Sequence, residues 1–210
     1  MDDNAAKASL NVPRETIERL GAFVGFLAEE NRRQNLVSQP SLEQVWSRHI
    51  VDSAQLLRFA PAGRGPWLDL GSGAGFPGLI IAALRPGHVT LVESRRLRAD
   101  FLRRAAEILG VSERVEIACA RVETMTPRTF DVITARAFAP LNRLLDLAEK
   151  FSTAKTRWIL PKGRNAQTEL AAAESSWQGE FRLEQSFTDP EAMIIVADCV
   201  RRRALGKKAR

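Results

Sequence analysis

The sequence of 210 residues predicts an α/β protein in which N-terminal helices precede a seven-stranded sheet with an antiparallel last strand. Three patterns support this fold class. Apolar residues recur at helical spacing before residue 61, and short apolar runs alternate with amphipathic segments after residue 66. Two strand-like runs then follow each other closely near the C-terminus. We expect a helical extension, residues 1–62, and a larger domain, residues 63–210, packed as a single unit.

The N-terminal third predicts two amphipathic helices. The first covers residues 14–31, and its apolar face is formed by Ile17, Leu20, Val24 and Leu27. A capping box from Ser41 to Gln44 predicts the start of a second helix, which runs to Pro61. The segment PAGRGP, residues 61–66, is too rich in glycine and proline for either regular element and marks a junction.

After this junction the pattern is that of βαβ units around a parallel sheet. Strands are expected in PWLDL, HVTLVE, RVEIACA, FDVITA and TRWILPK, with helices at about 77–84, 94–109, 141–151 and 165–177. Ser94 and Gly110 are suited to begin and end the second of these helices. The runs EFRLEQSF and AMIIVADCV are separated only by TDPE, so they must pair as antiparallel strands.

Composition limits the classes of function. No apolar run approaches the roughly 20 residues that cross a bilayer, and the acidic start MDDNAAKASL is not a secretory signal, so we expect a cytoplasmic protein. Cys119 and Cys199 are predicted to be buried thiols of a reducing compartment, and no metal site is expected. The formal charge is +6, with arginines crowded between residues 95 and 104 and a basic tail, RRRALGKKAR. This suits a polyanionic partner, but a solvated helix face explains it equally well.

The stretch DLGSGAGFPG, residues 69–78, follows a predicted strand and precedes a predicted helix. Glycines in such a turn let a ligand approach the backbone. Counted from Gly73, the stretch spells the dinucleotide pattern G-x-G-x-x-G; counted from Asp69, it spells an acidic residue followed by G-x-G-x-G. Because Gly71 follows the strand at once and the second half of a dinucleotide fold is missing, the second spelling, typical of S-adenosylmethionine sites, fits better.

Glu93 ends the second predicted strand about 20 residues beyond the turn. A carboxylate at this place can accept hydrogen bonds from both hydroxyls of an adenosine ribose. Both candidate cofactors contain that ribose, so Glu93 supports a nucleoside ligand without choosing between them. An exposed strand-end acid, or an acid in the first turn of the next helix, is the simpler alternative.

The motif DLGSGAG, the acid Glu93 and the antiparallel last strand together resemble the class I (Rossmann-like) S-adenosylmethionine-dependent methyltransferases. More narrowly, the chain resembles the RsmG (GidB) family through RQNLVS, RHIVDS, DLGSGAGFPGLIIA, ESRRLRADFLR, CARVE, TARAFAPL and LPKG, in the family's order. The resemblance implies a 16S rRNA (guanine-N(7))-methyltransferase with S-adenosyl-L-methionine as cofactor. It also implies that 16S ribosomal RNA, or the small ribosomal subunit, is the partner.

The resemblance also implies particular contacts. It places Gly71 and Phe76 of the glycine turn, with Gly73 between them, against the cofactor. It places Val122 and Glu123 beside the adenine and Arg136 at the cofactor's edge. Each of these positions follows a predicted strand end, where open α/β sheets bind ligands.

The seven-position nitrogen of guanine carries a lone pair in the plane of the base, so its methylation needs no general base, and we assign no catalytic residue. On the acceptor side, Lys162 and Arg164 stand beside a glycine and are candidates for gripping RNA phosphate or the guanine edge, although simple solvation is an alternative. His49 and Asp52 lie three residues apart on one helix face, where they can pair. A role for His49 at the pocket or at the RNA surface follows from the family resemblance.

Two other functions fit the residues less well. One is a methyltransferase for a protein or a small molecule, for which the basic charge is incidental. The other is an RNA-binding or ribosome-assembly factor with a vestigial cofactor site, which the intact glycine turn and Glu93 disfavour. The sequence contains no heptad repeat, so we expect a monomer.

Overall fold

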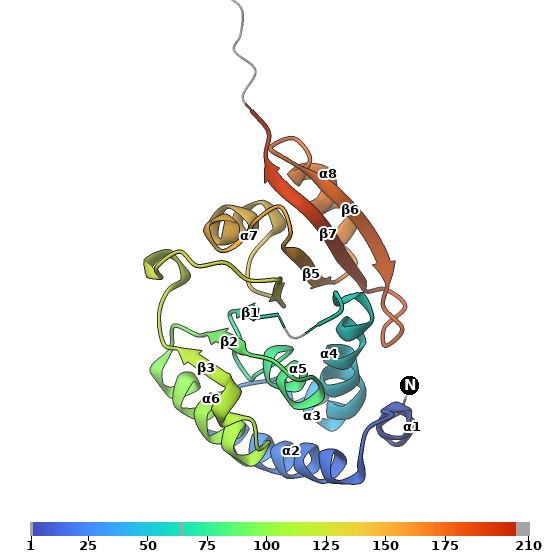
Figure 1. Ribbon diagram of the computed structural model, residues 1–210. Coiled ribbons are helices and arrows are strands. Elements are labelled where there is room, and N and C mark those ends of the chain that lie inside the picture. Colours follow the sequence, from blue (N-terminus) through green and yellow to red (C-terminus); the bar gives the residue numbers. More distant parts are fainter. Residues whose placement is uncertain (1, 64, 205–210) are drawn as a thin grey trace, which may run out of the picture.

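The computed structural model describes residues 2–63 and 65–204, so the last six residues of the basic tail lie outside it. A seven-stranded sheet with the order β3-β2-β1-β4-β5-β7-β6 forms its centre (Figure 1). The strands are β1 Trp67–Leu70, β2 Val89–Val92, β3 Val115–Ala118, β4 Val132–Ala135, β5 Arg157–Lys162, β6 Trp177–Gln185 and β7 Met193–Arg202. Strands β1 to β5 are parallel, and β7 is antiparallel to both of its neighbours. The predicted fold class is confirmed.

The three central strands β1, β2 and β4 are buried at all four of their positions. Parallel strands covered on both faces are mainly apolar, which explains why WLDL, VTLV and VITA could be recognised although each contains one buried polar residue. The strand order reverses between β1 and β4, because the chain builds β2 and β3 on one side of β1 and then returns to the other side. Loops at such a switch point diverge and leave room for a ligand.

Helices cover both faces of this sheet (Figure 1). Besides short 3₁₀ turns and a π-helical turn, they are α1 Asp3–Ser9, α2 Arg14–Gln34, α3 Gln39–Glu43, α4 Asp52–Ala54, α5 Gly78–Leu84, α6 Arg96–Ile108, α7 Leu141–Ala148 and α8 Ala166–Ala173. One hydrophobic cluster joins α2, α5 and α6 to the sheet, and a second joins α7 and α8 to it. In the first cluster, Phe23 of α2 packs against the rings of Phe76 and Phe101. The N-terminal helices therefore share a core with the sheet.

The second predicted N-terminal helix is wrong in its start and in its continuity. Its cap is Ser38, whose Oγ accepts a hydrogen bond from the backbone N–H of Ser41 at 3.4 Å. The hydroxyl of Ser41 donates back to the carbonyl of Ser38 at 2.9 Å, so it does not cap a helix of its own. Beyond α3 the chain forms a π-helical turn at Trp46–Val51 before α4.

Smaller differences concern element ends and the cysteines. Helix α6 begins at Arg96 and has no side-chain cap, so the role expected of Ser94 is wrong, whereas Gly110 ends it with φ +67° as expected. Trp177 opens β6 instead of closing a helix. Cys119 and Cys199 are exposed, so the prediction of buried thiols is wrong: Cys119 follows β3, an edge strand of the sheet, and Cys199 lies in an irregular part of β7 with φ +54°.

Within the described residues, no helix is both long and apolar enough to cross a membrane. The same part of the chain contains no group of three or more His, Cys, Asp or Glu side chains able to hold a metal ion.

Candidate functional site

The carboxyl ends of the parallel strands border two cavities. The first, which we call the glycine-turn cavity, has a volume of about 430 Å³ and is lined by Gly71, Val92, Glu93, Ser94, Arg95, Arg98, Ala120, Arg121, Val122, Glu123, Ala137 and Phe138. Four of the predicted cofactor contacts are in that list: Gly71, Glu93, Val122 and Glu123. The structure therefore brings together residues that are up to 52 positions apart in the sequence, counted from 71 to 123.

The glycine turn is held by the carboxylate of Asp69 at the end of β1. Its Oδ1 accepts a hydrogen bond from the Thr134 hydroxyl at 3.0 Å, and its Oδ2 accepts one from the Gly78 N–H at 3.3 Å. Complete burial raises the pKa of Asp69 to about 6. Gly71 and Gly73 have φ values of +68° and +52°, a region that glycine enters without strain. Asp69 thus ties the start of α5 to β1 and β4, and the positive φ values favour glycine at positions 71 and 73 of the turn.

Glu93 connects this turn to the start of α6. Its Oε2 accepts a hydrogen bond from the Gly73 N–H at 3.1 Å, and its Oε1 accepts one from the Arg95 N–H at 2.8 Å. The residue is 6% exposed and forms part of the cavity wall. The alternative that Glu93 is an exposed acid is excluded. Gly73 does not line the cavity, but its N–H binds the carboxylate of Glu93, which does, so a direct contact of Gly73 with the cofactor stays a prediction.

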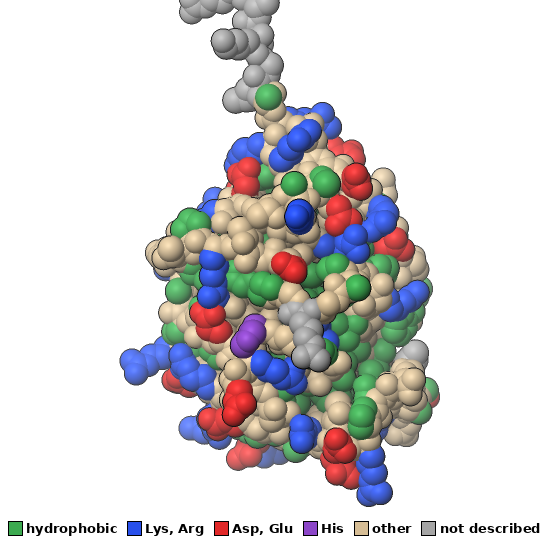
Figure 2. All heavy atoms as spheres, viewed as in Figure 1, with side chains coloured by type: hydrophobic (Ala, Val, Ile, Leu, Met, Phe, Trp, Pro, Cys, Tyr) green, Lys and Arg blue, Asp and Glu red, His purple; other side chains and the backbone are tan. Residues whose placement is uncertain are grey.

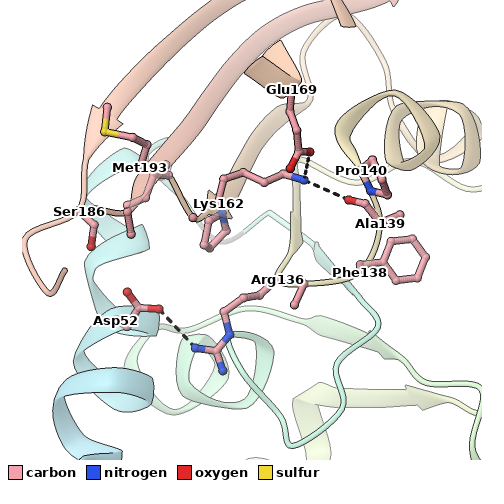
Figure 3. A pocket seen from close by; sticks show the side chains of 14 residues that line it. Asp52, Arg136, Phe138, Ala139, Pro140, Lys162, Glu169, Ser186 and Met193 are labelled. Carbon is pink, nitrogen blue, oxygen red and sulfur yellow. Dashed lines mark hydrogen bonds and ion pairs between the residues drawn. The ribbon is translucent and has the colours of Figure 1, made fainter. Parts of the chain in front are cut away.

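The second cavity, which we call the β4–β5 cavity and which Figure 3 shows, has a volume of about 500 Å³. It is lined by Asp52, Arg136, Ala137, Phe138, Ala139, Pro140, Pro161, Lys162, Gly163, Glu169, Ser186, Ala192, Met193 and Ile194. Ala137 and Phe138 line both cavities, so the two cavities share this part of their walls. The TARAFAPL motif does not by itself single out Phe138, since nothing in the sequence reveals that two cavities meet there.

Lys162 lies in the wall of the β4–β5 cavity with its ammonium group already engaged. Its Nζ donates to the Ala139 carbonyl at 3.0 Å and to Glu169 Oε2 at 2.8 Å (Figure 3). The same Oε2 accepts a hydrogen bond from the Leu141 N–H at 2.8 Å. These bonds fasten the loop after β4 to β5 and α8. Arg164 does not line the cavity; its guanidinium pairs with Glu191 at 3.2 Å and is 77% exposed.

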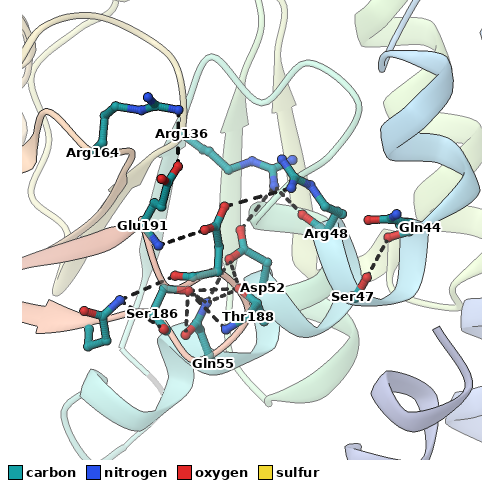
Figure 4. Close-up of polar contacts among 12 residues, drawn as sticks. Gln44, Ser47, Arg48, Asp52, Gln55, Arg136, Arg164, Ser186, Thr188 and Glu191 are labelled. Atoms are coloured by element: carbon teal, nitrogen blue, oxygen red, sulfur yellow. Dashed lines mark hydrogen bonds and ion pairs between the residues drawn. The ribbon is translucent and has the colours of Figure 1, made fainter. Parts of the chain in front are cut away.

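Arg136 joins the N-terminal helices to the floor of the β4–β5 cavity (Figure 4). Its guanidinium donates to Asp52 Oδ2 at 3.3 Å and to His49 Nδ1 at 2.9 Å. The His49 ring stacks on Phe76, with centroids 4.6 Å apart. His49 and Asp52 are thus linked through Arg136 rather than to each other. Phe76 is 4% exposed and lies in the core, and neither it nor Arg136 lines the glycine-turn cavity, so their contacts with a cofactor remain predictions.

The environment of His49 keeps its imidazole neutral. A guanidinium only donates, so Nδ1 accepts and the ring proton lies on Nε2, which has no hydrogen-bond partner in the described part of the chain. Burial, together with the charges of Arg136 and Arg48, lowers the pKa of His49 to about 3. The protonated form is therefore strongly disfavoured in the folded protein.

This pKa predicts a loss of stability in mild acid. The unfolded chain takes up a proton on His49 near pH 6.5, whereas the folded chain does not, so the free energy of unfolding falls as the pH drops below 6.5. At pH 5 the loss is about 2 kcal/mol. Asp69 acts in the opposite sense, because its raised pKa favours the folded state below pH 6.

A comparison with a His49→Asn variant separates the two effects. When the pH is lowered from 7.5 to 5, we expect the free energy of unfolding to fall by about 2 kcal/mol less for the variant than for the wild type, as measured by urea unfolding. Identical pH dependence in the two proteins would show that His49 titrates normally in the fold.

Comparisons with known proteins agree with this architecture. The GidB family model, described as rRNA small subunit methyltransferase G, matches residues 16–192. A protein of Rhizorhabdus wittichii named ribosomal RNA small subunit methyltransferase G is 52% identical, covering 100% of this chain and 99% of the relative. A protein of the same name from Zymomonas mobilis is 49% identical, covering 95% of this chain and 94% of the relative.

Solved structures match at the level of the fold. An O-methyltransferase from Bacillus cereus, solved in complex with SAH, superimposes with a TM-score of 0.60 at 17% identity and covers 93% of this chain and 96% of its own. A ribosomal protein L11 methylase from Lactobacillus delbrueckii gives a TM-score of 0.60 at 14% identity, covering 75% of this chain and 79% of its own. The family model and the full-length relatives are decisive: this chain belongs to the rRNA small subunit methyltransferase G (GidB) family.

Proposed function

We propose that this chain transfers the methyl group of S-adenosyl-L-methionine to the seven-position nitrogen of a guanosine in 16S ribosomal RNA. The observation that carries the proposal is that a cavity with the features of a nucleoside site adjoins a second cavity across a wall of two residues, Ala137 and Phe138. A donor bound in one cavity and an acceptor bound in the other would meet at these shared residues. The names of the full-length relatives supply the class of acceptor.

The cofactor is proposed to bind in the glycine-turn cavity. Glu93 accepts hydrogen bonds from the ribose hydroxyls, Val122 and Glu123 flank the adenine, and the methionyl part runs along Gly71 and Gly73. Glu93 is already oriented for this contact, because two backbone N–H groups hold its carboxylate in place. Such preorganisation reduces the entropy that binding must overcome.

The proposed chemistry requires positioning and no proton transfer. The carboxylates that border the β4–β5 cavity already have partners: Asp52 is bound by Arg136 and Thr188, and Glu169 by Lys162. Neither is arranged as a free base. Catalysis then consists of aligning the sulfonium, the methyl group and the nitrogen of an unstacked guanine.

The RNA-facing surface is proposed to combine the helical extension, residues 1–62, with the arginines of residues 95–104 and with Arg164. The face seen in Figure 2 supports no concentrated basic patch, since Lys and Arg side chains alternate there with Asp and Glu. Arg95 and Arg98 instead border the glycine-turn cavity, beside the site of reaction. We propose that the protein acts in the cytoplasm as a monomer, on free 16S ribosomal RNA or on the small subunit.

Replacing Lys162 by Ala is expected to lower kcat/KM for RNA methylation roughly tenfold, about 1.4 kcal/mol. The change removes the ammonium from the β4–β5 cavity and loosens the loop at Ala139 and Leu141, while the affinity for S-adenosylmethionine stays nearly constant. Lys155→Ala, at an exposed position, is the matched control. A large loss of cofactor affinity in the Lys162 variant would contradict its place on the acceptor side.

Product mapping tests the proposed function. Small subunits, and separately naked 16S RNA, from a strain lacking the corresponding gene are incubated with the protein and S-adenosylmethionine carrying a deuterated methyl group. Mass spectrometry of the nucleosides is expected to find labelled 7-methylguanosine, and mass spectrometry of ribonuclease fragments is expected to place it at one position of the 16S RNA. Label in protein or small molecules, or no label despite cofactor binding, would overturn the proposal.

A further inference from the structure

We infer that Phe138 recognises the positive charge of the methyl donor, and that its ring remains beside this charge as the methyl group crosses from one cavity to the other. The inference rests on the proposed function, because it assumes a sulfonium cofactor in the glycine-turn cavity. It assigns to Phe138 the selection of the charged cofactor over its uncharged product, S-adenosylhomocysteine.

The ring of Phe138 lies at the boundary of the two cavities. A Cβ added to Gly71 would lie 2.5 Å from Cδ2 of Phe138, so the ring rests directly on the glycine turn. Ala137, just before it, has φ +51°, a conformation that residues other than glycine rarely adopt. The backbone is thus bent at the point where the aromatic side chain is placed between the two cavities.

Hydrogen bonds from neighbouring elements hold the loop that carries the ring. Beyond Phe138, the Lys162 ammonium holds the Ala139 carbonyl at 3.0 Å, and Glu169 holds the Leu141 N–H at 2.8 Å. The lysine side chain is 10% exposed, so this contact is largely shielded from water. Because these bonds join the loop after β4 to β5 and α8, they hold the ring of Phe138 in a fixed place.

The methyl transfer moves a positive charge from the donor to the acceptor. In the transfer, the carbon–sulfur bond breaks with its electron pair remaining on sulfur, while the guanine lone pair forms the new carbon–nitrogen bond. The positive charge leaves the sulfur and appears on the methylated guanine ring. Because the methyl group must pass between the two cavities, both locations of the charge adjoin the wall that contains Phe138.

An aromatic face within about 6 Å of a cation attracts it through the ring quadrupole. S-adenosylmethionine and the amine analogue sinefungin carry a positive charge at this place, whereas S-adenosylhomocysteine is a neutral thioether. An aromatic side chain at position 138 therefore strengthens binding of the first two ligands and contributes to the third only by packing. Leucine, which is apolar but has no quadrupole, separates these two contributions.

The test is calorimetric titration of the full-length protein with S-adenosylmethionine, sinefungin and S-adenosylhomocysteine. For Phe138→Leu we expect about fivefold weaker binding of both charged ligands and a change of less than twofold for the thioether. Phe138→Tyr is expected to keep the wild-type ratio of affinities. Phe187→Leu is the matched control, because Phe187 is an exposed aromatic residue beside the Arg58 guanidinium and lines neither cavity.

Each outcome decides the inference. Equal weakening of all three ligands by Phe138→Leu would show a packing role only, and tighter binding of all three would show that the ring merely obstructs the cavity; either result overturns it. A wild-type protein that binds none of the ligands would overturn the proposed function as well. A wild-type protein that binds them but does not methylate guanosine would overturn the proposed function alone.

Discussion

A Glu93→Gln variant is expected to bind S-adenosylmethionine about 100-fold more weakly than the wild type. Hydrogen bonds to a charged acceptor contribute about 1.5–3 kcal/mol each, and the proposed ribose contact uses two hydroxyls. The amide also presents a donor to a backbone N–H, either of Gly73 or of Arg95, where the carboxylate accepts from both. Together these losses amount to about 3 kcal/mol.

Calorimetric titration measures this loss, and urea unfolding checks that the variant remains folded. Glu180→Gln, an exposed position on β6, is the matched control and should bind the cofactor as the wild type does. An affinity of the Glu93 variant within threefold of the wild type would mean that the adenosine does not rest on this carboxylate.

Gly78→Ala is expected to lower the free energy of unfolding by about 3 kcal/mol. A Cβ at this position would overlap Leu91 Cδ2 and lie 2.7 Å from Asp69 Oδ2 and 2.9 Å from Asp69 Cβ. Asp69 is fully buried and bound to the Gly78 N–H and to Thr134, so it cannot move aside without losing hydrogen bonds. Gly78 is thus required by packing between α5 and the sheet.

The matched control for Gly78 is Gly25→Ala in the exposed part of α2. An added Cβ at Gly25 meets nothing within 4 Å, and alanine favours a helix over glycine, so this variant should be more stable by about 1 kcal/mol. Urea unfolding of the two variants should give shifts of opposite sign. Equal stability of Gly78→Ala and the wild type would contradict the packing of α5 described above.

The sheet could be predicted from the sequence because short, mainly apolar runs alternate along the chain with amphipathic segments that form helices. The interruption of the second N-terminal helix after α3 could not be predicted. The backbone N–H groups of Trp46 and Ser47 donate to the carboxylate of Asp3, at 3.1 and 2.9 Å, and this contact joins residues more than 40 positions apart. A helix interrupted by such a long-range contact has no local sequence signal.

In the site, too, the residues with a local sequence pattern could be predicted, and those that depend on long-range contacts could not. Gly71 and Glu93 follow strand ends, a position that sequence patterns reveal, and both line one cavity. The partner of Lys162 depends on how α8 lies against β5, so Glu169 and its hold on the loop could not be foreseen. The importance of Phe138 likewise emerges only when two cavities are seen to share its ring.

The proposed methyl transfer takes place across the wall formed by Ala137 and Phe138. Crystals soaked with S-adenosylhomocysteine test it most directly. We predict that the adenosine lies in the glycine-turn cavity with its ribose on Glu93. The sulfur is then next to Phe138, and the side of it that carries the methyl group in S-adenosylmethionine faces the β4–β5 cavity. A ligand bound elsewhere, or a sulfur facing away from that second cavity, would contradict it.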